Sequence, residues 1–273
     1  MVKFFFAFFL LFTHLLADDL LNIKIKSFIG EQQYSENKEY INIIFSPKSN
    51  YYVKNRIDDV KIIKTLKENG LLNLFFKKPQ ELHLNFITSG SPLFFLKVMG
   101  DTLRDIGYYR YVTTHSNLNA SEFIWGISLT SEYATDPLIL QKELLKRGCS
   151  IIGITRKSAD KWDYSIDMTN SYLNVKKLYP NETIELKRSL YSHWVNISEI
   201  KHLKIRSSRR NSWYPYITYY DKSLHLLEVI KRDSRQRYIN LEIPPQAIYI
   251  KISDLYTLKN LKDPLILSPK GSR

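Results

Sequence analysis

The chain of 273 residues contains one cysteine, Cys149, and this scarcity excludes an internal disulfide framework. A chain without disulfides must obtain its stability from packing. The composition is sufficient for that, because 44% of the residues are hydrophobic and 14% are aromatic. Cys149 follows Gly148, which we expect to end a helix, and it begins an apolar strand. The sequence therefore predicts a buried structural thiol.

Motifs that carry catalysis are also absent. The chain has no G-x-S-x-G, no H-E-x-x-H and no glycine-rich phosphate loop, and it has only nine glycines. Its six histidines are dispersed without the spacing of metal ligands. We therefore predict that the protein is not an enzyme and holds no cofactor or metal. An unrecognised active site is the alternative hypothesis. Its candidate residues are Cys149 with His193 or His202, and the carboxylates of Asp163, Asp167 and Glu185.

Apolar runs of the roughly twenty residues that span a bilayer are missing as well. The longest run covers residues 4–16, follows Lys3 and ends at the small residue Ala17. This order is typical of a secretory signal peptide, and the abundance of Lys, Ile, Asn and Tyr is typical of AT-rich bacterial genomes. We predict a signal peptide over residues 1–17, no transmembrane span beyond it, and a periplasmic location. Leu15 stands where a small residue is usual, so retention as an uncleaved anchor is the alternative.

Positive charge exceeds negative charge. Forty Lys and Arg residues against 27 Asp and Glu residues give a formal net charge of +13. Such an excess favours anionic partners such as acidic polymers, membrane surfaces or acidic protein faces, although it also serves solubility. The densest basic groups lie at residues 201–210 and 231–237. We expect no nucleic-acid partner, because the chain carries an export signal and lacks helix-turn-helix and zinc-finger spacing.

Hydrophobic patterning divides the remaining chain into three regions. Residues 18–56 contain strand patterns at 21–29 and 40–45 around a polar stretch, so we predict a β-hairpin segment. Residues 57–170 begin with a helix capped by Asp58 or Asp59. They then show the order strand, helix, glycine and strand twice.

The two strand-helix-strand units share this order of elements, but their amino-acid sequences are not similar. The first has strands at 82–88 and 108–114, and the second has strands at 123–130 and 149–155 with a closing hairpin strand at 162–168. In both, a proline opens the helix and a glycine ends it. We expect helices to cover one face of a sheet. This layout resembles, in architecture only, the transport-associated domains of outer-membrane assembly proteins and the periplasmic domains of secretins.

Residues 171–273 carry strand patterns without helices. Seven short strands bounded by turn residues predict a β-sandwich. They are expected at 172–179, 183–187, 200–205, 215–219, 224–229, 238–243 and 247–252. The aromatic segment 205–220, followed by the proline pair 244–245, resembles jelly-roll carbohydrate-binding and discoidin-like domains. The predicted fold class is α+β, with an N-terminal α/β region of repeated βαβ type and a C-terminal jelly-roll-like sandwich.

The same aromatic segment carries the candidate binding site. Aromatic rings stack on sugar faces and guanidinium groups pair with carboxylates, so the combination favours a glycan with acidic groups. The candidate residues are Arg206, Arg209, Arg210, Trp213, Tyr214 and Tyr216. Packing of alternating aromatics in the core is the alternative interpretation.

These features predict an exported, non-enzymatic interaction or scaffold protein. We expect it to be a subunit or adaptor of an envelope-spanning assembly, such as a secretion apparatus or a flagellar motor, with envelope proteins as partners. The alternative is a protein that binds peptidoglycan or another anionic glycan through the C-terminal sandwich. An enzyme with an unrecognised site is the second alternative.

Overall fold

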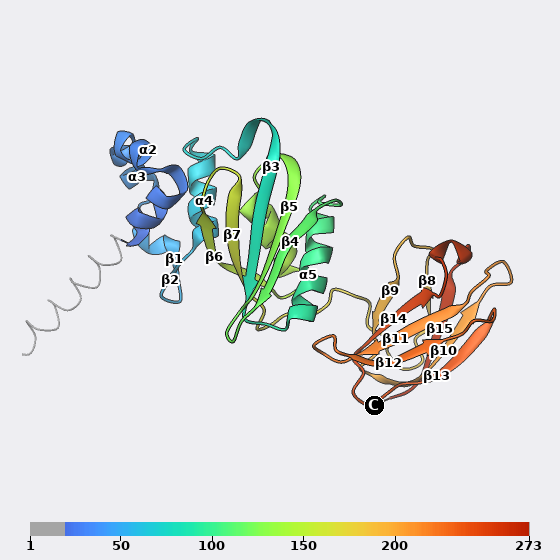
Figure 1. Ribbon diagram of the computed structural model, residues 1–273. Coiled ribbons are helices and arrows are strands. Elements are labelled where there is room, and N and C mark those ends of the chain that lie inside the picture. The colour runs from blue at the N-terminus through green and yellow to red at the C-terminus, as the bar shows by residue number, and fades with distance from the viewer. Residues whose placement is uncertain (1–19, 273) are drawn as a thin grey trace, which may run out of the picture. The chain divides into compact units, whose positions relative to one another are not determined.

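The computed structural model describes residues 20–272, and the predicted signal peptide at 1–17 lies outside the described residues. Helices and β-sheets are both present, so the fold is of mixed α+β type (Figure 1). The chain divides into two compact units, Met1–Tyr172 and Leu173–Arg273. This division lies close to the predicted boundary at 170.

The described N-terminal segment is mainly helical, so the hairpin predicted for residues 18–56 is wrong. Buried side chains explain why: Leu21, Ile25 and Phe28 are buried at helical spacing. Ile23, which alternates with Ile25 in sequence, is 56% exposed. The apparent strand pattern therefore arose from an exposed isoleucine on a helix. The elements are a helix at 20–29, α2 (Glu31–Glu36), α3 (Lys38–Ile44), η1 (Lys48–Tyr51), and the two-residue strands β1 (Tyr52–Val53) and β2 (Arg56–Ile57).

Five strands of the first unit form one mixed sheet in the order β4-β5-β3-β7-β6. The central strand β3 pairs antiparallel with β5 and parallel with β7, and both edge strands pair antiparallel with their neighbours. The strands are β3 (Phe75–Thr88), β4 (Val112–Leu118), β5 (Phe123–Tyr133), β6 (Ser150–Arg156) and β7 (Lys161–Asp167). The predicted order of strand, helix and strand is therefore present twice.

Helices α4 (Asp59–Glu68), α5 (Pro92–Asp105) and α6 (Pro137–Leu145) begin where the capping residues predict. The Asp58 carboxylate accepts the backbone N–H of Lys61 at 3.0 Å, and the Asp136 carboxylate accepts that of Leu138 at 3.0 Å. Beyond the ends of α5 and α6, Gly107 and Gly148 have φ angles of 96° and 67°. Such positive φ angles strain other residues, which is why glycine ends these helices.

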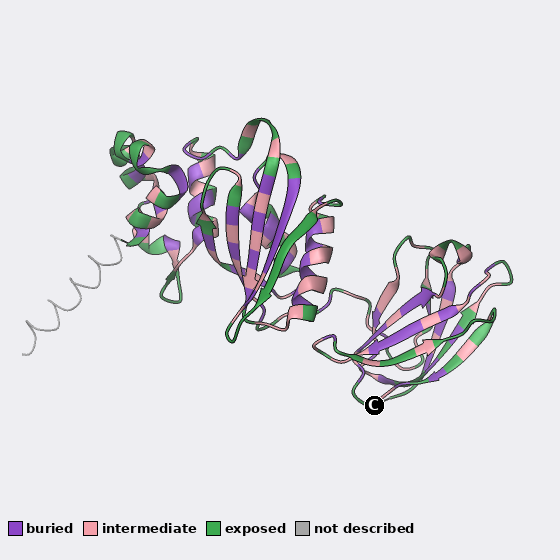
Figure 2. Ribbon diagram, in the orientation of Figure 1, coloured by how far each residue is buried: buried purple, intermediate pink, exposed green. Residues whose placement is uncertain are grey.

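One face of the sheet carries the core of this unit. Leu82, Leu84 and Phe86 alternate along β3 and are fully buried, while their neighbours on the other face are half-buried (Figure 2). Trp162 and Tyr164 on β7 extend the same buried row. Cys149 is also fully buried, which confirms the predicted burial of the thiol.

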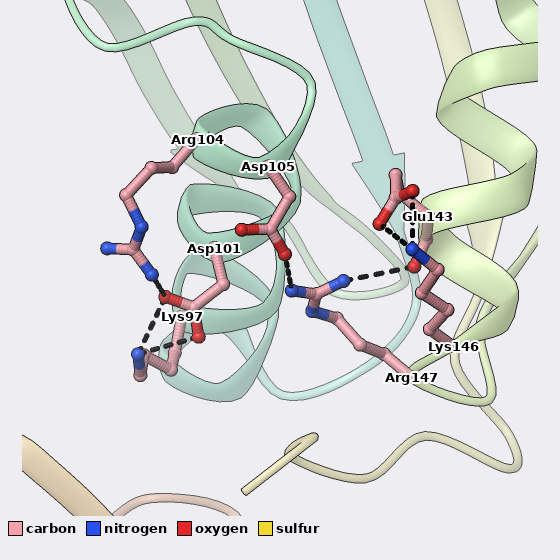
Figure 3. A network of polar contacts seen from close by, with 7 residues as sticks. All are labelled: Lys97, Asp101, Arg104, Asp105, Glu143, Lys146 and Arg147. Atoms are coloured by element: carbon pink, nitrogen blue, oxygen red, sulfur yellow. Dashed lines mark hydrogen bonds and ion pairs between the residues drawn. The ribbon is translucent and has the colours of Figure 1, made fainter.

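A polar network joins the C-terminal parts of α5 and α6 (Figure 3). On α5, Lys97 and Arg104 share the carboxylate of Asp101, each with an N–O distance of 2.6 Å. Arg147, just after α6, forms an ion pair with Asp105 and donates to the backbone carbonyl of Glu143 at 3.0 Å. Because Arg147 is only 5% exposed, its ion pair with Asp105 is partly buried and connects the two helices.

The second unit consists of eight strands in two antiparallel sheets. Their orders are β13-β10-β15-β8 and β12-β11-β14-β9. Buried residues of both sheets form one core cluster, so the two sheets pack face to face as a sandwich. The strands are β8 (Ile184–Leu186), β9 (His193–Asn196), β10 (Ile200–Ser207), β11 (Pro215–Tyr220), β12 (Leu226–Lys231), β13 (Tyr238–Glu242), β14 (Tyr249–Asp254) and β15 (Leu265–Ser272).

Six of the seven predicted strands are present in this unit. The strand predicted at 172–179 is wrong, because that segment makes only an isolated bridge between Lys177 and Asn196. Sequence reasoning missed β9 and β15. A short 3₁₀ helix, η2 (Leu258–Asn260), lies between β14 and β15.

Candidate functional site

The candidate site lies in loops at one end of the sandwich. Residues 208–214 connect β10 to β11, and residues 232–237 connect β12 to β13. These loops overlap the two densest basic segments of the sequence, 201–210 and 231–237, and the fold brings them side by side. We call the following residues the arginine cluster: Arg206, Arg209, Arg210, Arg232, Arg235 and Arg237.

Hydrogen bonds between the two loops establish this proximity. The Ser207 N–H donates to the carbonyl of Arg237 at 2.7 Å, and the Gln236 N–H donates to that of Trp213 at 2.9 Å. The guanidinium of Arg235 spans the gap, since it donates to the carbonyls of Arg209 at 2.5 Å and Asn211 at 2.9 Å. Arg235 therefore holds the loops together while its neighbours project into solvent.

Asn211 is one of two buried polar residues that fix the loop positions. Its side chain is 1% exposed, and its Oδ1 accepts the backbone N–H groups of Lys262 at 2.7 Å and Asp263 at 2.8 Å. Its Nδ2 donates to the Ser207 hydroxyl and to the Asp263 carbonyl, both at 3.1 Å. Every donor and acceptor of the amide is thus satisfied, so the loop has a defined position.

Asp254 is the second such residue. Its carboxylate is 7% exposed and accepts the backbone N–H of Tyr214 at 2.8 Å. It also accepts the N–H groups of Tyr256 at 3.0 Å and Thr257 at 2.9 Å, and the Asn260 amide at 2.9 Å. These bonds place the rings of Tyr214 and Tyr256 edge to face at a centroid distance of 5.0 Å. An aromatic pair therefore lies beside the arginine-bearing segment, with Tyr256 64% exposed and Tyr214 half-buried.

The arginine cluster is exposed, and most of its guanidinium groups have no carboxylate within ion-pair distance among the described residues. All six residues are exposed. Within residues 20–272, only Arg210 has a carboxylate in range, that of Asp263 at 3.5 Å. Arg206, Arg209 and Arg237 have no carboxylate within ion-pair distance among the described residues. Guanidinium groups that lack internal partners are available to an external anion.

Two of the six predicted site residues lie elsewhere. Trp213 has no exposed surface and donates its indole N–H to the carbonyl of Ser253 at 3.0 Å, so its ring belongs to the core and cannot stack on a ligand. Tyr216 is half-buried on the outer face of the β12-β11-β14-β9 sheet, where the Lys231 amino group lies 5.5 Å from its ring centroid. On β11, Tyr216 lies between the buried residues Pro215 and Ile217, and strand geometry directs successive side chains to opposite faces, which places its ring on the outer face.

Three residues of the alternative catalytic hypothesis, Cys149, Asp163 and Asp167, are engaged in local structure. Burial raises the pKa of the Cys149 thiol to about 11, so the thiol is protonated at neutral pH. Hydrogen bonds from Thr169 lower the pKa of Asp167, which makes this carboxyl a poor general acid. Asp163 accepts the Asn85 amide at 2.8 Å and pairs with Lys157 at 2.6 Å. These three side chains thus have structural partners within the first unit, whereas His193, His202 and Glu185 belong to the second unit.

In the part of the chain that the structure describes, no three His, Cys, Asp or Glu side chains gather as a metal site would need. Likewise, none of the helices within residues 20–272 has the length and apolar composition to cross a bilayer. Comparisons of this chain with protein-family models, with curated proteins and with solved structures find no match.

Proposed function

We propose that the protein is an exported, non-enzymatic interaction protein of the cell envelope, and that its sandwich unit anchors it to an acidic glycan such as peptidoglycan. The observation that carries this proposal is the arginine cluster, in which two basic loops distant in sequence meet at one end of the sandwich. Carboxylates are the natural partners of guanidinium groups, and peptidoglycan stems supply them. The export signal predicted at residues 1–17 would bring the protein to that material.

The tyrosine pair beside the cluster supports a glycan rather than a small anion. Tyr214 and Tyr256 lie on loops hydrogen-bonded to one another beside the cluster, and aromatic rings can pack on the apolar faces of sugar rings. A polymer with both sugar faces and carboxylates would engage rings and arginines together. We further propose that the sandwich belongs to the jelly-roll class.

The strand pairing supports the jelly-roll assignment. The first strand of the unit pairs with the last, β8 with β15, and the second with the penultimate, β9 with β14. The next pairs inward are β10 with β13 and β11 with β12. Such nested pairing arises when one long antiparallel hairpin is rolled into two sheets of four strands.

The test is co-sedimentation of the full mature chain with purified peptidoglycan sacculi over a series of salt concentrations. Arg206, Arg209 and Arg237 are changed together to Ala. At about 0.5–1 kcal/mol for each exposed contact, binding should weaken roughly ten- to a hundredfold, and the salt dependence should become shallower.

The matched control removes the same charge at the opposite end of the unit. Lys201, Lys222 and Lys270 are exposed there and are changed together to Ala. This variant should bind within about twofold of the unmodified chain. Equal loss of binding in both variants would mean that only net charge matters, and the proposed site would be abandoned.

A further inference from the structure

The two edge strands of the five-stranded sheet in the first unit differ in how their outer backbone groups are covered. The outer backbone groups of the edge strand β6 are covered: the Ile151 N–H donates to Gln141 Oε1 at 2.7 Å and the Ile154 N–H to Asp59 Oδ2 at 2.6 Å. The Ile154 carbonyl accepts the Lys24 ammonium at 2.7 Å. These side chains come from α6, α4 and the N-terminal helix, so this edge is closed to a further strand.

The opposite edge, β4, has no such cover. All seven of its residues are exposed, and Figure 2 shows the strand exposed along its whole length. Val112 is 66% exposed and Leu118 is 69% exposed. Within residues 20–272, β5 is the only strand that pairs with β4. Its outward backbone groups therefore face solvent.

The composition of β4 is unusual for an exposed edge. Its sequence, VTTHSNL, has no Lys, Arg, Asp, Glu or Pro, although 25% of the chain is charged. Charged residues and proline are the means by which proteins prevent unwanted strand pairing. A register shift between Thr113 and His115 is the one irregularity, and it leaves the last four residues regular.

The charged residues beside β4 indicate which kind of strand can pair with this edge. Arg110 precedes the strand, is exposed, and has no carboxylate within ion-pair distance among residues 20–272. It lines a groove of about 610 Å³ together with Tyr109 and Tyr111, while Glu81 lies in the wall formed by β3. Tyr109 is 72% exposed. Residues 20–172 hold 20 Lys and Arg against 16 Asp and Glu, a formal charge of +4, so a second copy would bring a like charge whereas an acidic strand would bring an opposite charge to Arg110.

We propose that β4 is a docking edge for an extended acidic segment of a partner protein, which adds to the sheet as a sixth strand. Main-chain hydrogen bonds to the outward groups of β4 supply the attachment. A carboxylate of the segment reaches Arg110 in the groove, and this contact sets the register. The site is in the first unit and is independent of the arginine cluster.

The experiment is photo-cross-linking in living cells of the native host, with the full chain carrying p-benzoylphenylalanine at Asn117 on β4. The matched position is Thr155, which is exposed on the closed edge strand β6. Tandem mass spectrometry then reads which segment of the partner is joined to the probe. The expected result is a defined adduct from Asn117 to a segment with several Asp or Glu residues, and none from Thr155.

Two further measurements make the outcome decisive. Arg110→Glu should lower the yield of the Asn117 adduct at least about tenfold, while sedimentation with peptidoglycan stays unchanged. A synthetic peptide of the cross-linked segment should slow hydrogen exchange of the β4 amides. The proposal is overturned by adducts of equal yield from both positions, by an adduct to a second copy or to a segment without carboxylates, or by no adduct at Asn117.

Discussion

Asn211 should be essential to the stability of the sandwich, although its side chain carries no charge. Its amide makes four hydrogen bonds, of 2.7, 2.8, 3.1 and 3.1 Å, that join three segments of the unit. At about 0.5–1 kcal/mol for each of the four lost bonds, Asn211→Ala should reduce the free energy of unfolding of this unit by about 2–4 kcal/mol. Water that enters the truncated site would place the loss near the lower end of this range.

Hydrogen exchange measured by mass spectrometry is the suitable assay, because peptides from β10 and β15 report on this unit alone. A loss of about 2–4 kcal/mol corresponds to exchange roughly 30- to 1000-fold faster at amides that open only by global unfolding. Binding to peptidoglycan should weaken as well, since Asn211 positions the loop that carries Arg209 and Arg210.

The control is Asn240→Ala, which removes an exposed amide from β13 in the same unit. It should change stability by no more than about 0.5 kcal/mol. If the two variants exchange at the same rate in β10 and β15, the buried amide does not hold the loops, and our account of how the arginine cluster is positioned is refuted.

Three further outcomes are expected. An alanine Cβ at Gly126 would lie 2.2 Å from the ring of the exposed His115, which must rotate away, so Gly126→Ala should lower stability by about 0.5–1.5 kcal/mol in thermal unfolding, and adding His115→Ala should restore most of it. Gly153→Ala, where the nearest atom would be 3.6 Å away, is the control, and equal loss in both would contradict this reasoning. Cys149 should react with a thiol reagent at pH 7.5 only after unfolding, because it is buried and its pKa is about 11; rapid reaction of the native chain would disprove its burial. Burial raises the pKa of Asp59 above its ordinary value of 3.8, so its contribution to stability is complete below that pH and is lost as pH rises through the folded-state pKa. Asp59→Asn should remove this pH dependence in urea unfolding, and an unchanged dependence would assign it to other groups.

Local signals in the sequence determined much of the first unit. Asp58, Asp136, Gly107 and Gly148 set the ends of three helices because capping and positive φ angles depend on a few neighbouring residues. The buried row on β3 followed from alternation for the same reason. The same alternation of apolar and polar residues gave a wrong prediction around Ile23. This isoleucine is exposed, and the buried residues near it, Leu21, Ile25 and Phe28, are spaced as on a helix.

Only the tertiary structure decided which residues form the candidate site. Arg209 and Arg235 are 26 positions apart in sequence, and they meet because β10 and β13 are neighbours in one sheet. Trp213 and Tyr214 are adjacent in sequence, yet one is in the core and the other on a surface loop. Strand order, which depends on the packing of the whole unit, also separated the covered edge β6 from the open edge β4. Composition determined that the protein is strongly basic, and the fold decided where that charge is gathered.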